Sequence, residues 1–180
     1  MFDKDYVISG VHGDYIRRLV ADIDANKNKL FSFGYDVFKN AAVIGFLYNN
    51  KASKKPSEAG HDFTILAAQF NNIRDDLRFN YQLIMLLDKS NESDFEIRLN
   101  KAFNEIDSDK AKKEELLFED YCRGGIEILY KKLIENSNKP EDYLLNLFDF
   151  IQEINERYNK DISTENILEM CRDSNIYKND

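Results

Sequence analysis

The sequence predicts an all-α protein, a single-domain bundle of six to seven helices with one short extended segment near residues 63–66. Gly (7) and Pro (2) are scarce among the 180 residues, which disfavours the turn-dense sandwiches and barrels of all-β proteins. Apolar residues recur at helical spacing along most of the chain. The segments between these stretches are short and polar. We therefore expect one helical domain over residues 1–172, followed by a frayed tail at 173–180.

Two helices account for the first part of the chain. The first covers about residues 9–25, and its apolar face recurs every four positions: Val11, Tyr15, Leu19 and Ile23. The second covers about residues 35–49 and is apolar or small almost all the way round, which indicates a position inside the core. Because glycine within a helix costs about 1 kcal/mol relative to alanine, Gly45 predicts a closely approaching neighbour.

A polar loop and a long helix follow. Residues 50–61 contain Pro56, Gly60 and several Ser and Lys residues, which is typical of a surface loop. Residues 63–66 form either a short strand or an extended entry to the next helix. That helix is predicted over residues 67–87, where apolar side chains gather on one side.

Two serines mark the starts of the next helices. Ser93 and Glu96 have the spacing of a capping box, which predicts a fourth helix to about Ile106. Ser108 is placed to cap a fifth helix through Tyr121.

A pair of glycines then interrupts an otherwise good helical pattern. Gly124 and Gly125 are followed by a helical repeat that resumes at Ile126. The two glycines either kink the helix or let another backbone pack against it, since neither has a Cβ atom. The sequence leaves both alternatives open.

The chain ends in two further predicted helices. Pro140 suits the first turn of a helix that runs to Tyr158. The side chains of this helix that we expect to face the core are Tyr143, Leu144, Leu147, Phe150, Ile151 and Ile154. Ser163 is predicted to cap a last short helix through Cys171.

The charge balance argues against nucleic acid as the default partner. The net charge is −8 and the pI is about 4.9, whereas DNA binding requires a cluster of cations. The charge is uneven, however. Residues 1–60 hold nine basic and seven acidic residues, and residues 61–180 hold 16 basic and 26 acidic residues. The front third could therefore face an anion, although an unevenly charged solvated surface is the simpler explanation.

Cysteine usage and the N-terminal residues bear on location. Cys122 and Cys171 show no CxxC or Cys/His spacing, which excludes zinc fingers and ribbons and favours buried, reduced thiols. The N-terminus has no basic region followed by an apolar one, so we expect no signal peptide. No apolar run is long enough to span a membrane. The expected compartment is the cytoplasm, without membrane association.

The sequence offers no clear catalytic constellation, and we expect no cofactor and no metal. Phosphate-binding and nucleophile motifs such as the P-loop, GxGxxG and GxSxG are absent. Glu58 and His61 form a single Glu-x-x-His on a loop, whereas a di-iron site needs two such pairs on facing helices. Neighbouring carboxylates such as Glu119 and Asp120 are expected by chance among 33 acidic residues. An enzyme built around His12, His61 and Glu58 is therefore the least favoured hypothesis.

Basic residues of the front third are candidates for phosphate contact. Three lysines lie on the 50–61 loop, and two arginines lie on the first predicted helix. The candidate residues for nucleic-acid binding are Arg17, Arg18, Lys51, Lys54 and Lys55. Lysines on a proline-containing loop more often serve solubility. A variant of this hypothesis is a DNA mimic whose acidic surface occupies a partner's DNA channel.

Two segments resemble a small bacterial family. The first is FGYDVF at residues 33–38, followed by AAVIGF at 41–46 and a basic loop from Lys51. The second is FEDYCRGGIEIL at residues 118–129. Both segments, in this order, resemble the small protein family associated with DNA phosphorothioation (Dnd) gene clusters, the bacterial systems that put sulfur into the DNA backbone. The chain has additional residues after about Ile134, to which the resemblance assigns no role.

The resemblance implies a genome-defence setting and no particular reaction. Within its motifs, we assign a structural role to Gly45, Gly124, Gly125 and Glu127. The preferred hypothesis is a non-enzymatic accessory or adaptor protein of such a defence system, which contacts a protein partner through an apolar or acidic helical face. The alternative is a DNA-binding or DNA-sensing module that uses the basic residues of the front third.

Overall fold

The computed structural model describes residues 4–56, 62–106 and 108–158. Over these residues the protein is mostly helical, which confirms the predicted all-α class. The elements in chain order are β1 (Tyr6–Ile8), α1 (Val11–Leu19), α2 (Gly34–Leu47), β2 (Phe63–Ile65), α3 (Ala67–Phe70), α4 (Arg74–Leu87), α5 (Phe95–Leu99), a π-helical turn η1 (Asn100–Asn104), a 3₁₀ turn η2 (Asp109–Ala111), α6 (Lys112–Leu133) and α7 (Pro140–Tyr158).

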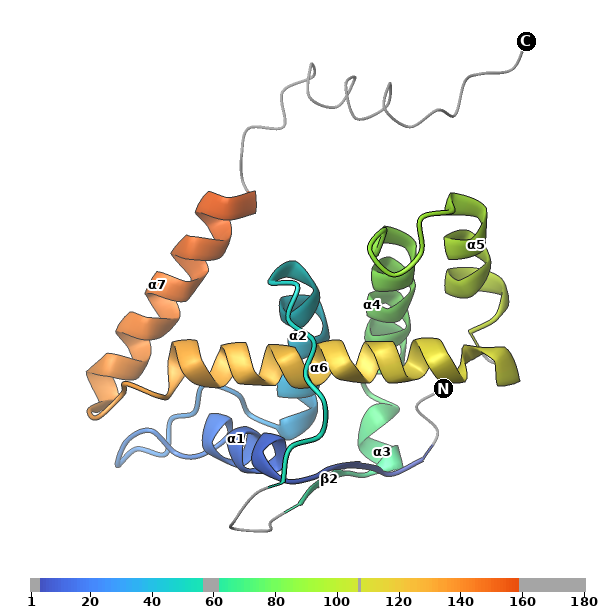
Figure 1. The fold of residues 1–180 in the computed structure, drawn as a ribbon. Coiled ribbons are helices and arrows are strands. Elements are labelled where there is room, and N and C mark those ends of the chain that lie inside the picture. The colour runs from blue at the N-terminus through green and yellow to red at the C-terminus, as the bar shows by residue number, and fades with distance from the viewer. Residues whose placement is uncertain (1–3, 57–61, 107, 159–180) are drawn as a thin grey trace.

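Helix α6 is the axis of the molecule (Figure 1). Helix α2 crosses it near its middle, α1 and the short sheet lie along one side, and α7 rises from its C-terminal end. The side chains of α2, α4 and α6 form one buried core. Its largest fully buried aromatic side chains are Phe38, Phe70, Tyr81, Phe118 and Tyr121. The predicted burial of α2 is thus observed, because this helix is apolar nearly all the way round.

A two-stranded antiparallel sheet joins the N-terminus to the segment after the 50–61 loop. Strand β1 pairs with β2, with Tyr6 opposite Ile65 and Ile8 opposite Phe63. The strand alternative for residues 63–66 is therefore the one observed. Sequence analysis missed β1, because three residues carry too little alternation to indicate a strand.

Two predicted helices are shorter than expected. Helix α1 ends at Leu19 instead of Ala25. The chain after it turns back on itself, since the Asp24 carboxylate accepts hydrogen bonds from the backbone N–H groups of Asn26 and Asn28, both at 2.9 Å. Such side-chain hydrogen bonds compete with helix formation. The helix predicted over 67–87 is likewise divided into α3 and α4, with the break at residues 71–73.

Helix starts follow the predicted capping residues only in part. Ser108 does cap a helical turn, since its Oγ accepts from the N–H of Lys110. Helix α5 is capped by Asp94, whose Oδ1 accepts from the N–H of Ile97 at 3.1 Å, so the predicted capping box at Ser93 is not used. Helix α7 begins at Pro140 and reaches Tyr158, as predicted.

The interruption predicted within the fifth helix does not occur. Helix α6 runs without a break from Lys112 to Leu133, straight through Gly124 and Gly125. The predicted helix over 163–171 and the tail at 173–180 lie outside the described residues. Within the described part of the chain, no helix has the length and apolar character needed to cross a membrane.

Candidate functional site

Glycines allow α2 and α6 to touch backbone to backbone. A Cβ atom built on Gly45 would lie 2.0 Å from the carbonyl oxygen of Tyr121. One built on Gly125 would lie 1.8 Å from the carbonyl oxygen of Ala41. Real Cβ atoms do not approach this closely, so each glycine leaves room for the backbone of the other helix. Of the two alternatives for the glycine pair, a close approach is what the structure shows, with no kink.

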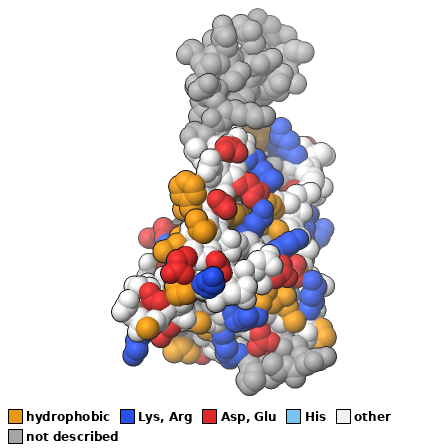
Figure 2. Space-filling view, turned by 90° about the vertical axis from the view of Figure 1, so that its left-hand side faces the viewer, with side chains coloured by type: hydrophobic (Ala, Val, Ile, Leu, Met, Phe, Trp, Pro, Cys, Tyr) orange, Lys and Arg blue, Asp and Glu red, His pale blue; other side chains and the backbone are white. Residues whose placement is uncertain are grey.

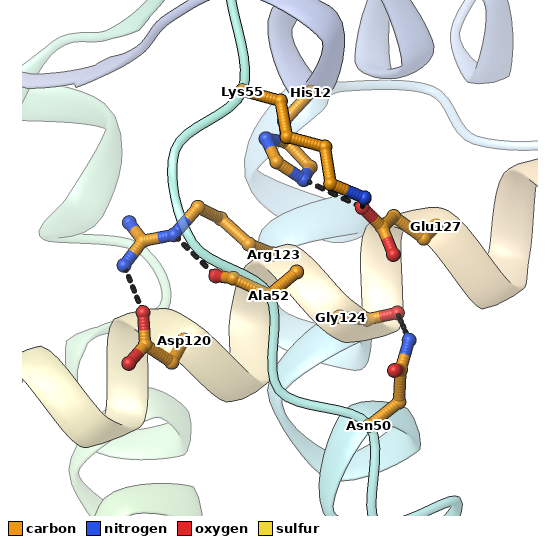
Figure 3. A network of polar contacts seen from close by, with 8 residues as sticks. All are labelled: His12, Asn50, Ala52, Lys55, Asp120, Arg123, Gly124 and Glu127. Carbon is orange, nitrogen blue, oxygen red and sulfur yellow. Dashed lines mark hydrogen bonds and ion pairs between the residues drawn. The ribbon is translucent and has the colours of Figure 1, made fainter.

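The loop after α2 crosses over α6 at the same place (Figure 3). A Cβ atom on Gly124 would lie 1.9 Å from the carbonyl oxygen of Asn50. The side-chain amide of Asn50 donates a hydrogen bond to the carbonyl of Gly124 at 2.9 Å. The N–H of Ala52 donates to the carbonyl of Asp120 at 3.0 Å. Loop residues 50–55, which we call the strap, are therefore held against α6 by hydrogen bonds along their length.

Arg123 is the buried cation beneath the strap. Its Nε donates to the carbonyl of Ala52 at 2.9 Å, and its two other nitrogens bind Asp120 at 2.6 Å and Glu119 at 3.2 Å. Burial by itself would lower the pKa of the guanidinium, but the hydrogen bonds with the two carboxylates outweigh it and raise the pKa of Arg123. The residue stays charged and ties the strap to α6.

Glu127 joins three segments through a single oxygen atom. Its Oε1 lies 3.1 Å from Nε2 of His12 on α1 and 2.6 Å from Nζ of Lys55 on the strap (Figure 3). Burial favours the neutral carboxylic acid, yet the hydrogen bonds from Lys55 and His12 prevail and lower the pKa of Glu127. Glu127 therefore remains an anion that links α1, the strap and α6.

His12 is fully buried on α1. Burial lowers the pKa of His12, although the hydrogen bond with Glu127 opposes this shift. The ring is accordingly neutral at pH 7, with its proton on Nε2 facing the carboxylate. Its Nδ1 is buried without a hydrogen-bond partner among the described residues. Glu58 and His61 lie outside those residues.

The network is suited to holding segments together. Within the described ranges no group of three or more His, Cys, Asp or Glu side chains is placed to hold a metal ion. Cys122, on the same helix, is buried in the core, and burial raises the pKa of its thiol well above the ordinary value. Because His12 has no exposed surface, its ring does not meet solvent from which a substrate could approach.

Most of the candidate basic residues have partners within the chain. Arg17 binds the backbone carbonyl of Asp62, and Arg18 binds the hydroxyl of Tyr130. The guanidinium of Arg18 also lies 5.2 Å from the centre of the Tyr130 ring. Both arginines of α1 thus have partners within the chain, although both remain exposed at the surface.

The three lysines of the strap differ in whether they have a partner within the chain. Lys55 is engaged by Glu127, as described. Lys51 lies 3.9 Å from Oδ2 of Asp88 and 4.9 Å from the centre of the Tyr121 ring, whereas Lys54 is exposed. The N–H of Val11 donates to the carbonyl of Lys55, so the strap and α1 are adjacent. The structure thus brings part of the basic set together, although mostly in internal contacts.

Helix α7 is attached to the rest of the molecule along one side. Phe150 is buried, and Glu153 accepts hydrogen bonds from Lys132 at 2.6 Å and from the hydroxyl of Tyr48 at 2.8 Å. The carboxylate of Asp142 accepts from the backbone N–H groups of residues 138 and 139, which closes the start of the helix and lowers the pKa of Asp142. These contacts fix which side of α7 faces away from the core.

The side of α7 that faces away is apolar. Four of its side chains, which we call the α7 outer face, are 58% to 64% exposed: Leu144, Leu145, Phe148 and Ile151. Sequence analysis placed Leu144 and Ile151 inside and did not single out Leu145 or Phe148. The other four side chains predicted to face inward do pack on the core: Tyr143, Leu147, Phe150 and Ile154. An apolar sector wider than one helical face was the available signal that this helix has a second contact surface.

Comparison with known proteins identifies no relative. No family model matches the chain, and no curated protein or solved structure matches it at a significant level.

Proposed function

We propose that this chain is a non-enzymatic accessory protein of a DNA phosphorothioation-linked defence system and that it acts by protein–protein contact. The contact surface is the α7 outer face. The resemblance of residues 33–46 and 118–129 to the phosphorothioation-associated family supports the setting. The exposed apolar side chains of α7 support the mode of action.

The α7 outer face is the observation that carries this proposal. Single exposed apolar residues, such as Phe79 and Leu116, are normal on protein surfaces. On α7, by contrast, four large apolar side chains occur within two helical turns. Full burial of a large apolar side chain is worth about 1.5–3 kcal/mol, so covering this face would supply substantial binding energy. Contiguous exposed apolar surface is typical of sites that bind another protein.

The position of α7 in the chain agrees with an adaptor role. The segments that resemble the family build the crossing of α2, the strap and α6. Helix α7 begins at Pro140, after the point near Ile134 where the resemblance ends. We infer that the family-like part forms a rigid base and that α7 adds a contact surface to it.

Co-purification from the native host tests the proposal. The tagged full chain is compared with a Phe148→Ser/Ile151→Ser variant and with a matched Phe79→Ser/Leu116→Ser control, in which the replaced side chains are equally exposed on α4 and α6. We expect the wild type and the control to retain a protein of the defence locus, identified by mass spectrometry, and the α7 variant to lose it. Recovery of no defence protein by the wild type, or equal recovery by the α7 variant, would overturn the proposal.

DNA binding through the basic set is the competing hypothesis. It predicts a mobility shift with short duplex DNA that weakens steeply as the salt concentration rises. We expect no salt-sensitive shift, with or without phosphorothioate links, because Arg17, Arg18 and Lys55, although exposed, are already bound to partners within the chain. A salt-sensitive shift that disappears when these three residues are replaced by glutamine would favour the DNA-binding alternative.

A further inference from the structure

The charged side chains on the outward half of α7 itself all have one sign. Glu141, Asp149 and Glu156 are exposed, and steps of about 100° per residue place them on the outward half of the helix with the apolar side chains. The only Lys or Arg in α7 is Arg157. Its guanidinium is turned away, since it lies 4.4 Å from the centre of the Tyr48 ring and 3.6 Å from Glu153. The α7 outer face is therefore an apolar surface bordered by carboxylates.

The shape of this surface suits a helix. Leu144, Phe148 and Ile151 follow one another at steps of four and three residues, which forms a ridge about 10 Å long. A groove of about 290 Å³ adjoins its N-terminal end. Its apolar lining includes Leu144, Ile23 and Leu30, and one residue of each charge, Asp24 and Lys29, also lines it. Figure 2 shows hydrophobic side chains at the surface on this side of the molecule, with both acidic and basic side chains among them. A ridge beside a groove is the relief into which the side chains of an amphipathic helix pack.

Charge decides between the occupants of this face. A second copy of the chain would bring the same carboxylates against themselves, which is repulsive. The chain's own residues 159–180 hold five acidic and three basic side chains, so they do not complement the face either. Nucleic acid and the surface of an anionic membrane are also negatively charged. A partner that borders its apolar stripe with cations complements both features.

We propose that the α7 outer face binds an amphipathic helix of a partner protein whose apolar stripe is bordered by Lys and Arg. This inference rests on the proposed function, because it names the chemistry of the partner that the same face contacts. The partner's apolar side chains cover Leu144, Phe148 and Ile151. Its cations approach Asp149 and Glu156.

Peptide binding to the full chain tests this chemistry. The probes are three fluorescein-labelled helical peptides of about 18 residues with the same leucine stripe, bordered by lysine, glutamine or glutamate. Fluorescence anisotropy is recorded at physiological and at high salt. We expect the lysine peptide to bind at least about tenfold more tightly than the glutamate peptide, with a preference that shrinks at high salt.

Two pairs of variants separate the apolar and the charged contributions. Phe148→Ser/Ile151→Ser is expected to weaken binding of the lysine peptide by about 30-fold or more, whereas Phe79→Ser/Leu116→Ser leaves it unchanged. Asp149→Lys/Glu156→Lys is expected to reverse the preference toward the glutamate peptide. Asp75→Lys/Glu96→Lys alters the net charge by the same amount at exposed positions on α4 and α5 and should leave the preference as it is. Circular dichroism melts establish that every variant is folded.

The outcomes distinguish this inference from the proposed function. Equal binding of the three peptides, lost in Phe148→Ser/Ile151→Ser, would overturn the cationic partner and leave α7 as the contact surface. Failure of all three peptides to bind would overturn the inference, and so would peptide binding that neither α7 variant changes. In either case the co-purification experiment still tests the proposed function. Tight, charge-selective binding without any co-purified defence protein would uphold the inference and overturn the defence-system setting.

Discussion

Helix α6 contacts α2 and α7 in two different ways. At the crossing with α2, the two backbones are in contact. A side chain at position 45 or 125 would clash with the backbone of the other helix. At its C-terminal end, α6 meets α7 through side chains, among them Lys132 and its partner Glu153. The other side of α7 is left apolar and uncovered by the described residues.

The α2–α6 crossing therefore helps to specify the fold, whereas the α7 outer face is available for contact with another molecule. A backbone contact cannot relax by rotating a side chain, so the α2–α6 crossing tolerates little change. The exposed side chains of α7 make few contacts within the protein, so they can change at small cost to stability. Substitutions in the two regions should therefore have opposite effects on unfolding and on binding.

Alanine at the crossing should cause the largest loss of stability. Gly125→Ala places a methyl group against the carbonyl of Ala41, and we expect it to lower the free energy of unfolding by more than about 3 kcal/mol or to prevent folding. Gly124→Ala places a methyl group against the backbone of Asn50 in the strap, and because a loop can adjust more readily than a packed helix, a smaller loss of about 2 kcal/mol is expected there. Urea titration of both variants measures the difference. Equal effects would contradict the contrast between a helix contact and a loop contact.

Loss of the buried cation should have the next largest effect. Arg123→Met keeps the unbranched stem of the side chain but removes the guanidinium group and leaves the carbonyl of Ala52 without its donor, which we expect to cost about 2–3 kcal/mol. Lys113→Met, an exposed position on the same helix, serves as the control and should stay within about 0.5 kcal/mol. Limited proteolysis should also cut the strap faster in Arg123→Met. An unchanged cutting rate would show that Arg123 does not hold the strap.

The buried histidine predicts a pH dependence of stability. His12 has an ordinary pKa of 6.5 when unfolded and a lower pKa when folded, so between these two values the unfolded chain binds more protons. Stability from this group is complete above about pH 6.5 and falls as the pH drops below it, by at most about 1.4 kcal/mol per pH unit. Urea titrations between pH 7.5 and about 5 should show this slope in the wild type and in His61→Gln but not in His12→Gln. A slope that survives in His12→Gln would contradict the assignment.

The smallest effect on stability is expected at α7. Phe148→Ser and Ile151→Ser should each alter the free energy of unfolding by less than about 0.5 kcal/mol, because both side chains are about 60% exposed. Thermal melts test this alongside the binding experiments. A large destabilisation by either variant would mean that the α7 outer face is part of the core of the folded protein.

The positions of several helices could be predicted from the sequence, whereas the contacts that each helix makes with distant residues could not. Helix α2 was recognisable because it is apolar all round, and α7 because Pro140 precedes a strong repeat. Which apolar side of α7 faces inward depends on Lys132 and Tyr48, which are distant in sequence. The bond between His12 and Glu127 joins residues 115 positions apart and leaves no local signal. Asp24 and Asp94 set helix ends through a few side-chain hydrogen bonds to the backbone that propensity alone does not resolve.

The strap also constrains the order in which the chain can assemble. Its hydrogen bonds with α6 join residues 68 to 74 positions apart, and the residues of α6 are the later ones. During synthesis, the apolar surface of α2 is therefore made long before the helix that covers it. Closing so long a segment is entropically costly until α6 has docked, so the strap should be among the last parts to become protected from hydrogen exchange during refolding.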